Sequence, residues 1–111
     1  MQRIWISVVM LVLLGVAATL LPVPAGAQWL DTQKREFLAQ CDSGCARNPN
    51  VGNQTERCPI YCRCLVREGE KIFSAEDYDE LDQLARRGGD SPKLQRFREL
   101  FPVCNRHAFS D

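Results

Sequence analysis

Apolar side chains recur with the period of an α-helix in four segments of the chain. The first segment runs from about Thr32 to Arg47, with Asp31 or Thr32 as its cap, and a polar loop over residues 48–54 follows it. When each residue is advanced by about 100° around a helical axis, the apolar residues of this segment gather on one side. They are Leu30, Phe37, Leu38, Cys41 and Cys45.

A second helix is predicted from near Pro59, a residue that suits a first helical turn, to about Phe73. One side of this helix is apolar and the opposite side is charged. The apolar stripe consists of Cys58, Tyr61, Cys62, Leu65, Val66, Gly69, Ile72 and Phe73.

Two more helices are predicted in the C-terminal part of the chain. Ser74 followed by carboxylates is a helix start, and the glycine pair 88–89 ends the third helix. Ser91 and Pro92 open the fourth helix, and we expect Pro102 to close it. Because no stretch of four or more residues alternates with the period of a strand, the pattern predicts an all-α fold.

Residues 1–27 have the pattern of a secretory signal peptide. Arg3 is the only charged residue before Asp31, an apolar stretch follows it, and residues 25–27 read Ala-Gly-Ala, which suits signal peptidase. We expect cleavage after Ala27 and a protein that is periplasmic or secreted. The rival interpretation is an uncleaved anchor, since the 18 residues from position 4 to position 21 are just long enough to cross a bilayer.

Residues 28–111 have the length of one small domain. Without Arg3, the 14 lysines and arginines of the chain fall to 13, against 14 aspartates and glutamates. This near-neutral balance predicts no nucleic-acid partner. A chain this short buries a modest core, and exported domains of this size commonly add disulfides.

The six cysteines all fall in residues 28–111, and an even number in an exported chain predicts disulfides. Cysteines four residues apart lie on one face of a helix, about 6 Å apart along its axis. Two such pairs on consecutive antiparallel helices can be bridged twice, which predicts Cys41–Cys62 and Cys45–Cys58. Cys64 lies about 200° around the helix from Cys62, at roughly 100° per residue, so by elimination it pairs with Cys104.

The two C-x3-C motifs and their 12-residue connection resemble the twin C-x3-C hairpin of the small translocase chaperones of the mitochondrial intermembrane space. The resemblance covers Cys41 to Cys62 only, and it implies a helical hairpin without implying a function. Those chaperones have no cleavable secretory signal and no counterpart of Cys64 or Cys104. The Tyr61-Cys62-x-Cys64 element is also similar to small exported bacterial proteins.

The cysteines also admit a role in thiol–disulfide exchange or in holding copper or zinc, which is the alternative to a structural role. The Cys62-x-Cys64 pair is the redox candidate, but side chains two apart on a helix point in nearly opposite directions. An oxidising compartment favours bridging over metal binding. We expect no cofactor and no metal.

No residue has the setting of a catalytic group, and we expect a non-enzymatic protein. His107, the only histidine, lies near the C-terminus, and the acidic residues from Glu76 to Asp82 suit the first turns of a helix. The expected role is therefore that of a small exported binding or accessory protein.

A partner, if it is charged, is expected to be an acidic protein or an anionic lipid of the envelope. Arg86, Arg87 and Arg96 are the candidate contacts, because a guanidinium holds a carboxylate or phosphate with two hydrogen bonds. The competing interpretation is an ordinary solvated surface. The apolar alternative is a surface that includes Trp29, Ile60 or Phe109, and membrane contact is expected only if the signal stays uncleaved.

Overall fold

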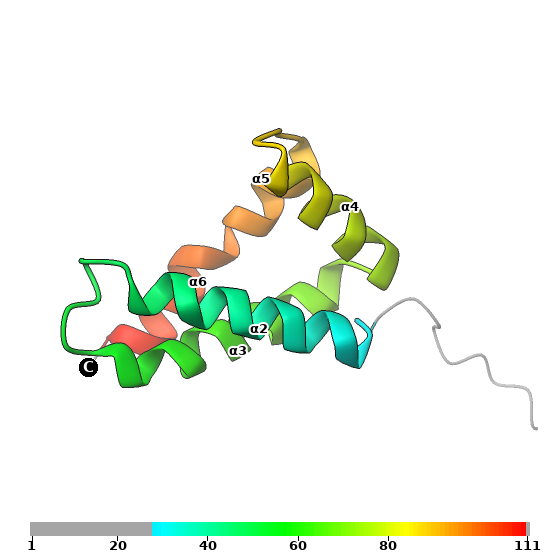
Figure 1. Cartoon of the computed structure of the whole chain (residues 1–111). Helices are drawn as coiled ribbons and strands as arrows, with labels where there is room; N and C mark the ends of the chain where they lie inside the picture. Colours follow the sequence, from blue (N-terminus) through cyan, green and yellow to red (C-terminus); the bar gives the residue numbers. More distant parts are fainter. Residues whose placement is uncertain (1–27, 111) are drawn as a thin grey trace, which may run out of the picture.

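The computed structural model describes residues 28–110, which are helical and contain no strand (Figure 1). The expected signal peptide lies outside the described residues. The elements are α2 (Asp31–Ala46), the 3-10 turn η1 (Thr55–Arg57), α3 (Cys58–Ile72), α4 (Ala75–Arg86), α5 (Pro92–Arg98) and α6 (Leu100–Phe109). The prediction of an all-α disulfide-stapled fold is confirmed.

The first turn of α2 is fixed by Gln33, which lies off the apolar stripe. Its side-chain oxygen accepts the backbone N–H of Leu30 at 2.9 Å. The cap is therefore Leu30, which comes before both predicted caps, Asp31 and Thr32. Its side-chain nitrogen donates to the carbonyl oxygen of Ala75 at 2.9 Å and to Asp79 at 3.0 Å. The start of α2 is thereby tied to the start of α4.

The predicted cap of α4 is confirmed. The Asp77 N–H donates to the Ser74 hydroxyl at 3.1 Å, and the Ser74 N–H donates to the Asp77 carboxylate at 3.0 Å. This reciprocal pair satisfies two backbone donors that have no partner within the helix. Lys93 of α5 donates to the same carboxylate. The hydrogen bond from Lys93 and, to a smaller extent, the one from the Ser74 N–H hold the pKa of Asp77 below its usual value.

The expectation that Pro102 closes the fourth helix is wrong. The segment breaks at Glu99 into α5 and α6, and Pro102 is the third residue of α6. The N–H groups of a first helical turn have no partner within the helix, so a proline there removes no hydrogen bond. The helix therefore continues to Phe109.

Helix α3 is the centre of the fold. Helix α2 and α6 both pack closely on α3, and far less on each other. Helices α4 and α5 form an arm that rises from the end of the hairpin, after which α6 returns along α3 (Figure 1). The Arg57 guanidinium donates to the carbonyl oxygen of Ala108 at 3.3 Å, which joins the start of α3 to the end of α6.

Trp29 belongs to the core, and the expectation that it is exposed is wrong. It is 4 % exposed, and its indole N–H donates to the carbonyl oxygen of Phe73 at 3.1 Å. Its ring lies against Gly69, where α3 presents no side chain. Ile72, placed on the apolar stripe from the sequence, is 36 % exposed instead. Ile60 is exposed as expected, and Phe109 is half-buried.

Between residues 28 and 110, no helix combines the length and the apolar character needed to cross a membrane. The expectation of an anchor concerns residues outside this range.

Candidate functional site

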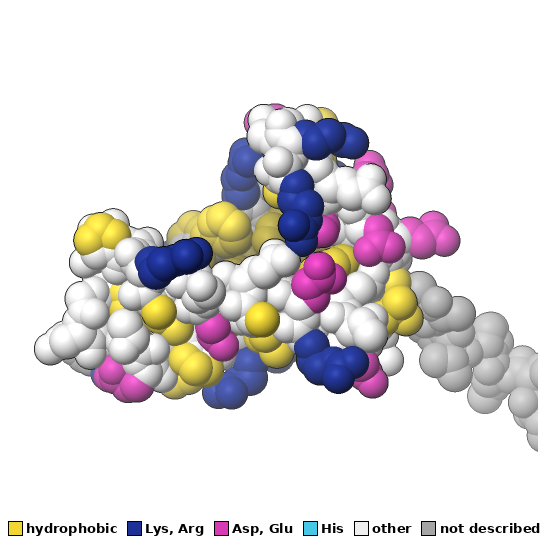
Figure 2. Space-filling view, viewed as in Figure 1, with side chains coloured by type: hydrophobic (Ala, Val, Ile, Leu, Met, Phe, Trp, Pro, Cys, Tyr) yellow, Lys and Arg dark blue, Asp and Glu magenta, His cyan; other side chains and the backbone are white. Residues whose placement is uncertain are grey.

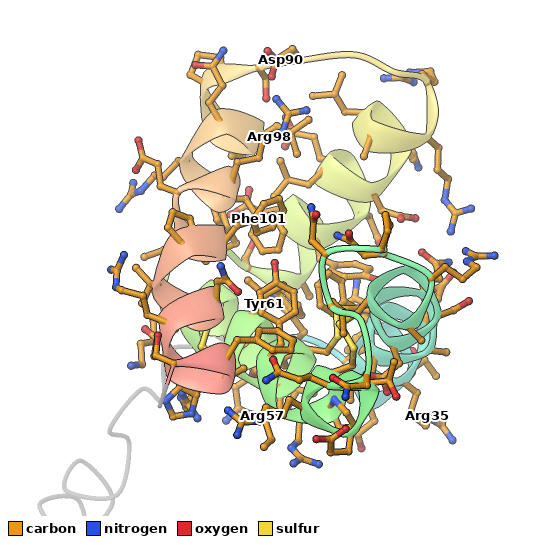
Figure 3. The ribbon with its side chains drawn as sticks, turned by 90° about the vertical axis from the view of Figure 1, so that its left-hand side faces the viewer. Arg35, Arg57, Tyr61, Asp90, Arg98 and Phe101 are labelled. Carbon is orange, nitrogen blue, oxygen red and sulfur yellow. A yellow bond between two sulfur atoms is a disulfide. The ribbon has the colours of Figure 1, made fainter. Side chains whose placement is uncertain are left out.

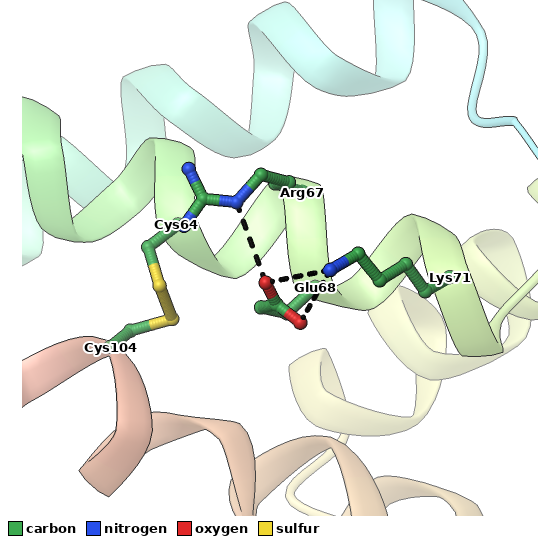
Figure 4. Close-up of a disulfide and its surroundings, with 5 residues drawn as sticks. All are labelled: Cys64, Arg67, Glu68, Lys71 and Cys104. Atoms are coloured by element: carbon green, nitrogen blue, oxygen red, sulfur yellow. Dashed lines mark hydrogen bonds and ion pairs between the residues drawn. A yellow bond between two sulfur atoms is a disulfide. The ribbon is translucent and has the colours of Figure 1, made fainter. Parts of the chain in front are cut away.

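The structure joins the three cysteine pairs that the helix geometry predicts. Cys41–Cys62 and Cys45–Cys58 bridge α2 to α3 with Cα–Cα distances of 5.9 Å in both cases. Cys64–Cys104 bridges α3 to α6 at 5.6 Å, and none of the six cysteines is free (Figure 4). Three disulfides indicate an oxidising compartment outside the cytoplasm.

The neighbours Cys62 and Cys64 serve opposite sides of α3. Cys62 is bonded to α2 and Cys64 to α6, and both sulfurs are buried together with that of Cys104. Near the Cys64–Cys104 bridge, Glu68 of α3 accepts hydrogen bonds from Arg67 and Lys71 (Figure 4). The cysteines thus hold α2 and α6 at fixed positions on the two flanks of α3.

This arrangement leaves an open groove over α3, between α2 and α6. The groove has a volume of about 710 Å³. Tyr61 of α3 and Phe101 of α6 point into it, and the loop after α2 closes its end (Figure 3). We call it the amide groove; its lining is Gln40, Cys41, Gly44, Cys45, Asn48, Asn50, Val51, Gln54, Tyr61, Phe101, Pro102, Asn105 and Phe109.

The lining of the amide groove contains no charged side chain and five carboxamides. Within residues 28–110 the side chains of Gln40, Gln54 and Asn105 make no hydrogen bond, whereas Asn48 accepts one from the backbone of Asn50 at 3.0 Å. Each free carboxamide offers both donors and an acceptor. The groove therefore offers unfilled hydrogen bonds of both kinds around an apolar floor.

The aromatic residues of the groove form its floor and one wall. Tyr61 and Phe109 lie with ring centroids 6.0 Å apart, and burial raises the pKa of the Tyr61 phenol. Tyr61 therefore stays protonated and keeps its hydroxyl donor at physiological pH. In Figure 2, apolar side chains are visible in the hollow behind α2, over α5 and α6.

A smaller hollow of about 190 Å³ lies between α2, α4 and α5, and we call it the ring pocket. Its lining is Trp29, Phe37, Gln40, Tyr78, Leu81, Asp82, Ala85, Leu94 and Phe97. A third hollow joins the ring pocket to the amide groove. It shares Phe37, Gln40 and Phe97 with the ring pocket. It shares Gln40, Tyr61 and Phe101 with the amide groove.

The candidate arginines belong to the arm formed by α4 and α5. None of them lines the amide groove, the ring pocket or the third hollow, but Arg86 pairs with Asp82 of the ring pocket. Arg86 donates to Asp82 at 3.0 Å and to Glu36 at 3.4 Å, and the hydrogen bond with Asp82 is the main cause of its raised pKa. Arg87 and Arg96 are exposed and form no ion pair within the described residues. On the face shown in Figure 2, the arm carries both kinds of charge, with basic side chains at its top and centre and acidic side chains mostly toward the right-hand side.

The groove residues were not recognised as a site from the sequence. Phe101, Asn105 and Phe109 recur every four residues, which is the signal of one helical stripe. Because a helix end is expected at Pro102, the residues on its two sides are not expected to share one helical face. Within residues 28–110, no three side chains of the metal-ligating types gather in one place.

No protein-family model, curated protein or solved structure matches this chain.

Proposed function

We propose that this chain is a small exported binding protein without catalytic activity, and that its amide groove holds a short helix of a partner polypeptide. The observation that carries the proposal is the uncharged groove, bounded by helices on two sides and by α3 beneath. A helix laid in such a groove buries its own apolar face, which is a common mode of peptide recognition.

The spacing of the walls favours a helix over other occupants. The α2 wall presents Gln40 and Gly44 one turn apart, and Asn48 follows in the loop just after this helix. The α6 wall presents Phe101, Asn105 and Phe109, also one turn apart. Gly44 has no atom within 4 Å of the place where a Cβ would lie, so another backbone can approach α2 closely there. A helix in this position completes a four-helix arrangement with α2, α3 and α6.

The groove is preorganised by the three disulfides. Each flanking helix is covalently joined to α3, so little conformational entropy remains to be lost when the partner binds. Helix α6 is 10 residues long, which corresponds to about 15 Å of helix and sets the length of the segment that the groove can cover.

Export in this proposal relies on the signal pattern of residues 1–27, and a periplasmic or secreted location follows from it. The partner is proposed to be an acidic protein, because exposed Arg87 and Arg96 can steer an acidic surface toward the molecule while its helix occupies the groove. A membrane lipid bound by the arginines would instead give salt-sensitive vesicle binding that groove variants leave unchanged.

The alternative, a thiol–disulfide or copper-handling protein, requires accessible sulfurs that open from their bridges. Counting thiols in the native protein with a reagent that needs no denaturant separates the two functions. The binding-protein proposal expects none, whereas two or more free thiols would support the alternative.

The proposal is tested by placing a photoreactive phenylalanine analogue in the groove and, as a control, outside it. Phe101 lines the groove and is 38 % exposed, while Val103 on the same helix is 45 % exposed and lies outside the lining. With the native envelope fraction, we expect one polypeptide to be cross-linked through position 101 and not through position 103. Equal labelling from both positions, or labelling of lipid alone, would contradict a polypeptide site in the groove.

A further inference from the structure

The ring pocket has the size of a site for one small ring. A cavity of about 150 Å³ lined by leucine, isoleucine and phenylalanine is known to stay dry and to bind benzene. The ring pocket measures about 190 Å³, so it can hold a six-membered ring with a short substituent.

The walls of the pocket are suited to an aromatic occupant. Trp29 and Tyr78 lie with centroids 4.8 Å apart, and Phe37 and Phe97 meet edge to face at 6.0 Å with an angle of 86°. These rings therefore present both faces and edges around the pocket. Aromatic rings prefer edge-to-face or offset neighbours, so a further ring gains more here than an aliphatic group of equal volume.

The polar groups at the pocket favour a neutral ring over a cation. Asp82 is the one charged residue of the lining, and the Arg86 guanidinium 3.0 Å away already compensates its charge. The uncharged polar side chains of the lining include Gln40 and Tyr78, and Gln40 also lines the amide groove. A substituent on the ring can therefore hydrogen-bond to Gln40 at the side where the pocket opens toward the groove.

We propose that the ring pocket binds a single uncharged aromatic ring, and that this ring is the anchor side chain of the partner helix. The identity of the anchor rests on the proposed function, whereas the ring site itself does not. Interfaces of this kind concentrate binding energy in one aromatic side chain that fills a pocket, and uncharged polar contacts surround it.

Benzyl alcohol is a suitable probe, because Trp29 lines the pocket and is the only tryptophan of residues 28–111. We expect saturable binding seen by Trp29 fluorescence and by nuclear Overhauser contacts from the probe to Tyr78 and Phe97. Cyclohexylmethanol should bind at least several-fold more weakly, and tetramethylammonium should not compete. Absence of saturable binding, equal binding of cyclohexylmethanol, or preference for the cation would each overturn the inference.

A blocking variant and a matched control test whether benzyl alcohol binds in the ring pocket. Ala85 is exposed at the lining of the ring pocket, so Ala85→Phe can fill the pocket without strain in the core. Ala39 is exposed on α2 and lies outside the linings of the ring pocket and the groove. We expect Ala85→Phe to weaken benzyl alcohol binding at least tenfold and Ala39→Phe to leave it unchanged, with folding of both checked by thermal melts. Equal affinity in all three proteins would overturn the assignment.

The failure of the ring site and the failure of the proposed function are distinguishable. Excess benzyl alcohol should lower the yield of the cross-link from position 101, because it competes for the anchor. If the probe does not bind while the cross-link persists, the partner site stands and the ring site is wrong. If the probe binds and no polypeptide is cross-linked, the ring site stands and the anchor role is wrong.

Discussion

The indole ring of Trp29 lies directly against Gly69 of α3. A Cβ added to Gly69 would be 2.9 Å from two ring carbons of Trp29 and 3.3 Å from the ring of Phe97. Trp29 cannot easily move aside, because it is buried and its indole N–H is bonded to the carbonyl oxygen of Phe73. The absence of a side chain at position 69 is therefore what allows the chain before α2 to pack onto α3.

Gly69→Ala should destabilise the protein although alanine favours helix. Overpacking in a core costs about 1–3 kcal/mol, and the gain in helix propensity offsets about 1 kcal/mol of it. Gly44→Ala is the matched control, because nothing lies within 4 Å of its added Cβ. It should stabilise α2 by about 0.5–1 kcal/mol. Thermal melts should move in opposite directions for the two variants, and a stabilised Gly69→Ala protein would show that Trp29 does not pack there.

Removal of the Cys64–Cys104 bridge should cost more than removal of Cys41–Cys62. From the sequence we expect the reverse order, because Cys41–Cys62 closes the hairpin at the densest predicted apolar contact, which consists of Phe37, Leu38, Leu65 and Ile72. Of these four residues, Ile72 is 36 % exposed in the structure. The two bridges span 40 and 21 residues, and the loop-entropy difference between them is about 0.6 kcal/mol in favour of the longer one. Cys64 and Cys104, which close the longer loop, also belong to a buried cluster with Leu65.

The comparison should use double variants to alanine, so that no unpaired thiol is left to exchange. Urea unfolding of the Cys64/Cys104 pair and the Cys41/Cys62 pair would give the two free energies of unfolding. Equal losses would mean that the contact of α6 with α3 does not depend on the bridge.

Tyr78 should make the protein less stable in alkali. Burial is the main cause that raises the pKa of its phenol from 10.0 to about 12, and the carboxylates of Asp82 and Glu36 add to the effect. The unfolded chain therefore loses the phenolic proton first, and the free energy of unfolding falls as the pH rises through the interval between these two values. Well below pH 10 the Tyr78 phenol is protonated in both states, so it does not change the free energy of unfolding with pH.

Tyr78→Phe is the control for that titration. The Tyr78 hydroxyl donates no hydrogen bond within residues 28–110, so its loss leaves no buried partner unsatisfied. Denaturant midpoints measured at pH 9 and pH 11 should fall less in Tyr78→Phe than in the unchanged protein. The same fall in both would assign the alkaline instability to other groups.

Helix positions and the pairing of the cysteines could be predicted from the sequence because both depend on local periodicity. The predicted bounds of the first two helices differ from α2 and α3 by one residue. The burial of Trp29 could not be predicted in this way, because it depends on the empty position at Gly69, which is 40 residues away. The groove was missed for a related reason: the continuation of α6 past Pro102 depends on a break at Glu99 that leaves no clear mark in the pattern.

Processing after Ala27 should give a mature chain that begins at Gln28. The structure makes this position matter: Gln28 is exposed, whereas Trp29, the next residue, is buried and hydrogen-bonded to Phe73. Cleavage after Ala27 keeps Trp29, whereas cleavage two residues further would remove Trp29 and with it one wall of the ring pocket.

Intact-mass measurement of the exported protein should give residues 28–111 less six hydrogen atoms, one pair for each of the three bridges. Loss of ammonia from an N-terminal glutamine that cyclises would be consistent with the same cleavage. A full-length mass, or a chain that begins after Trp29, would contradict it, and in the second case the pocket described above could not form.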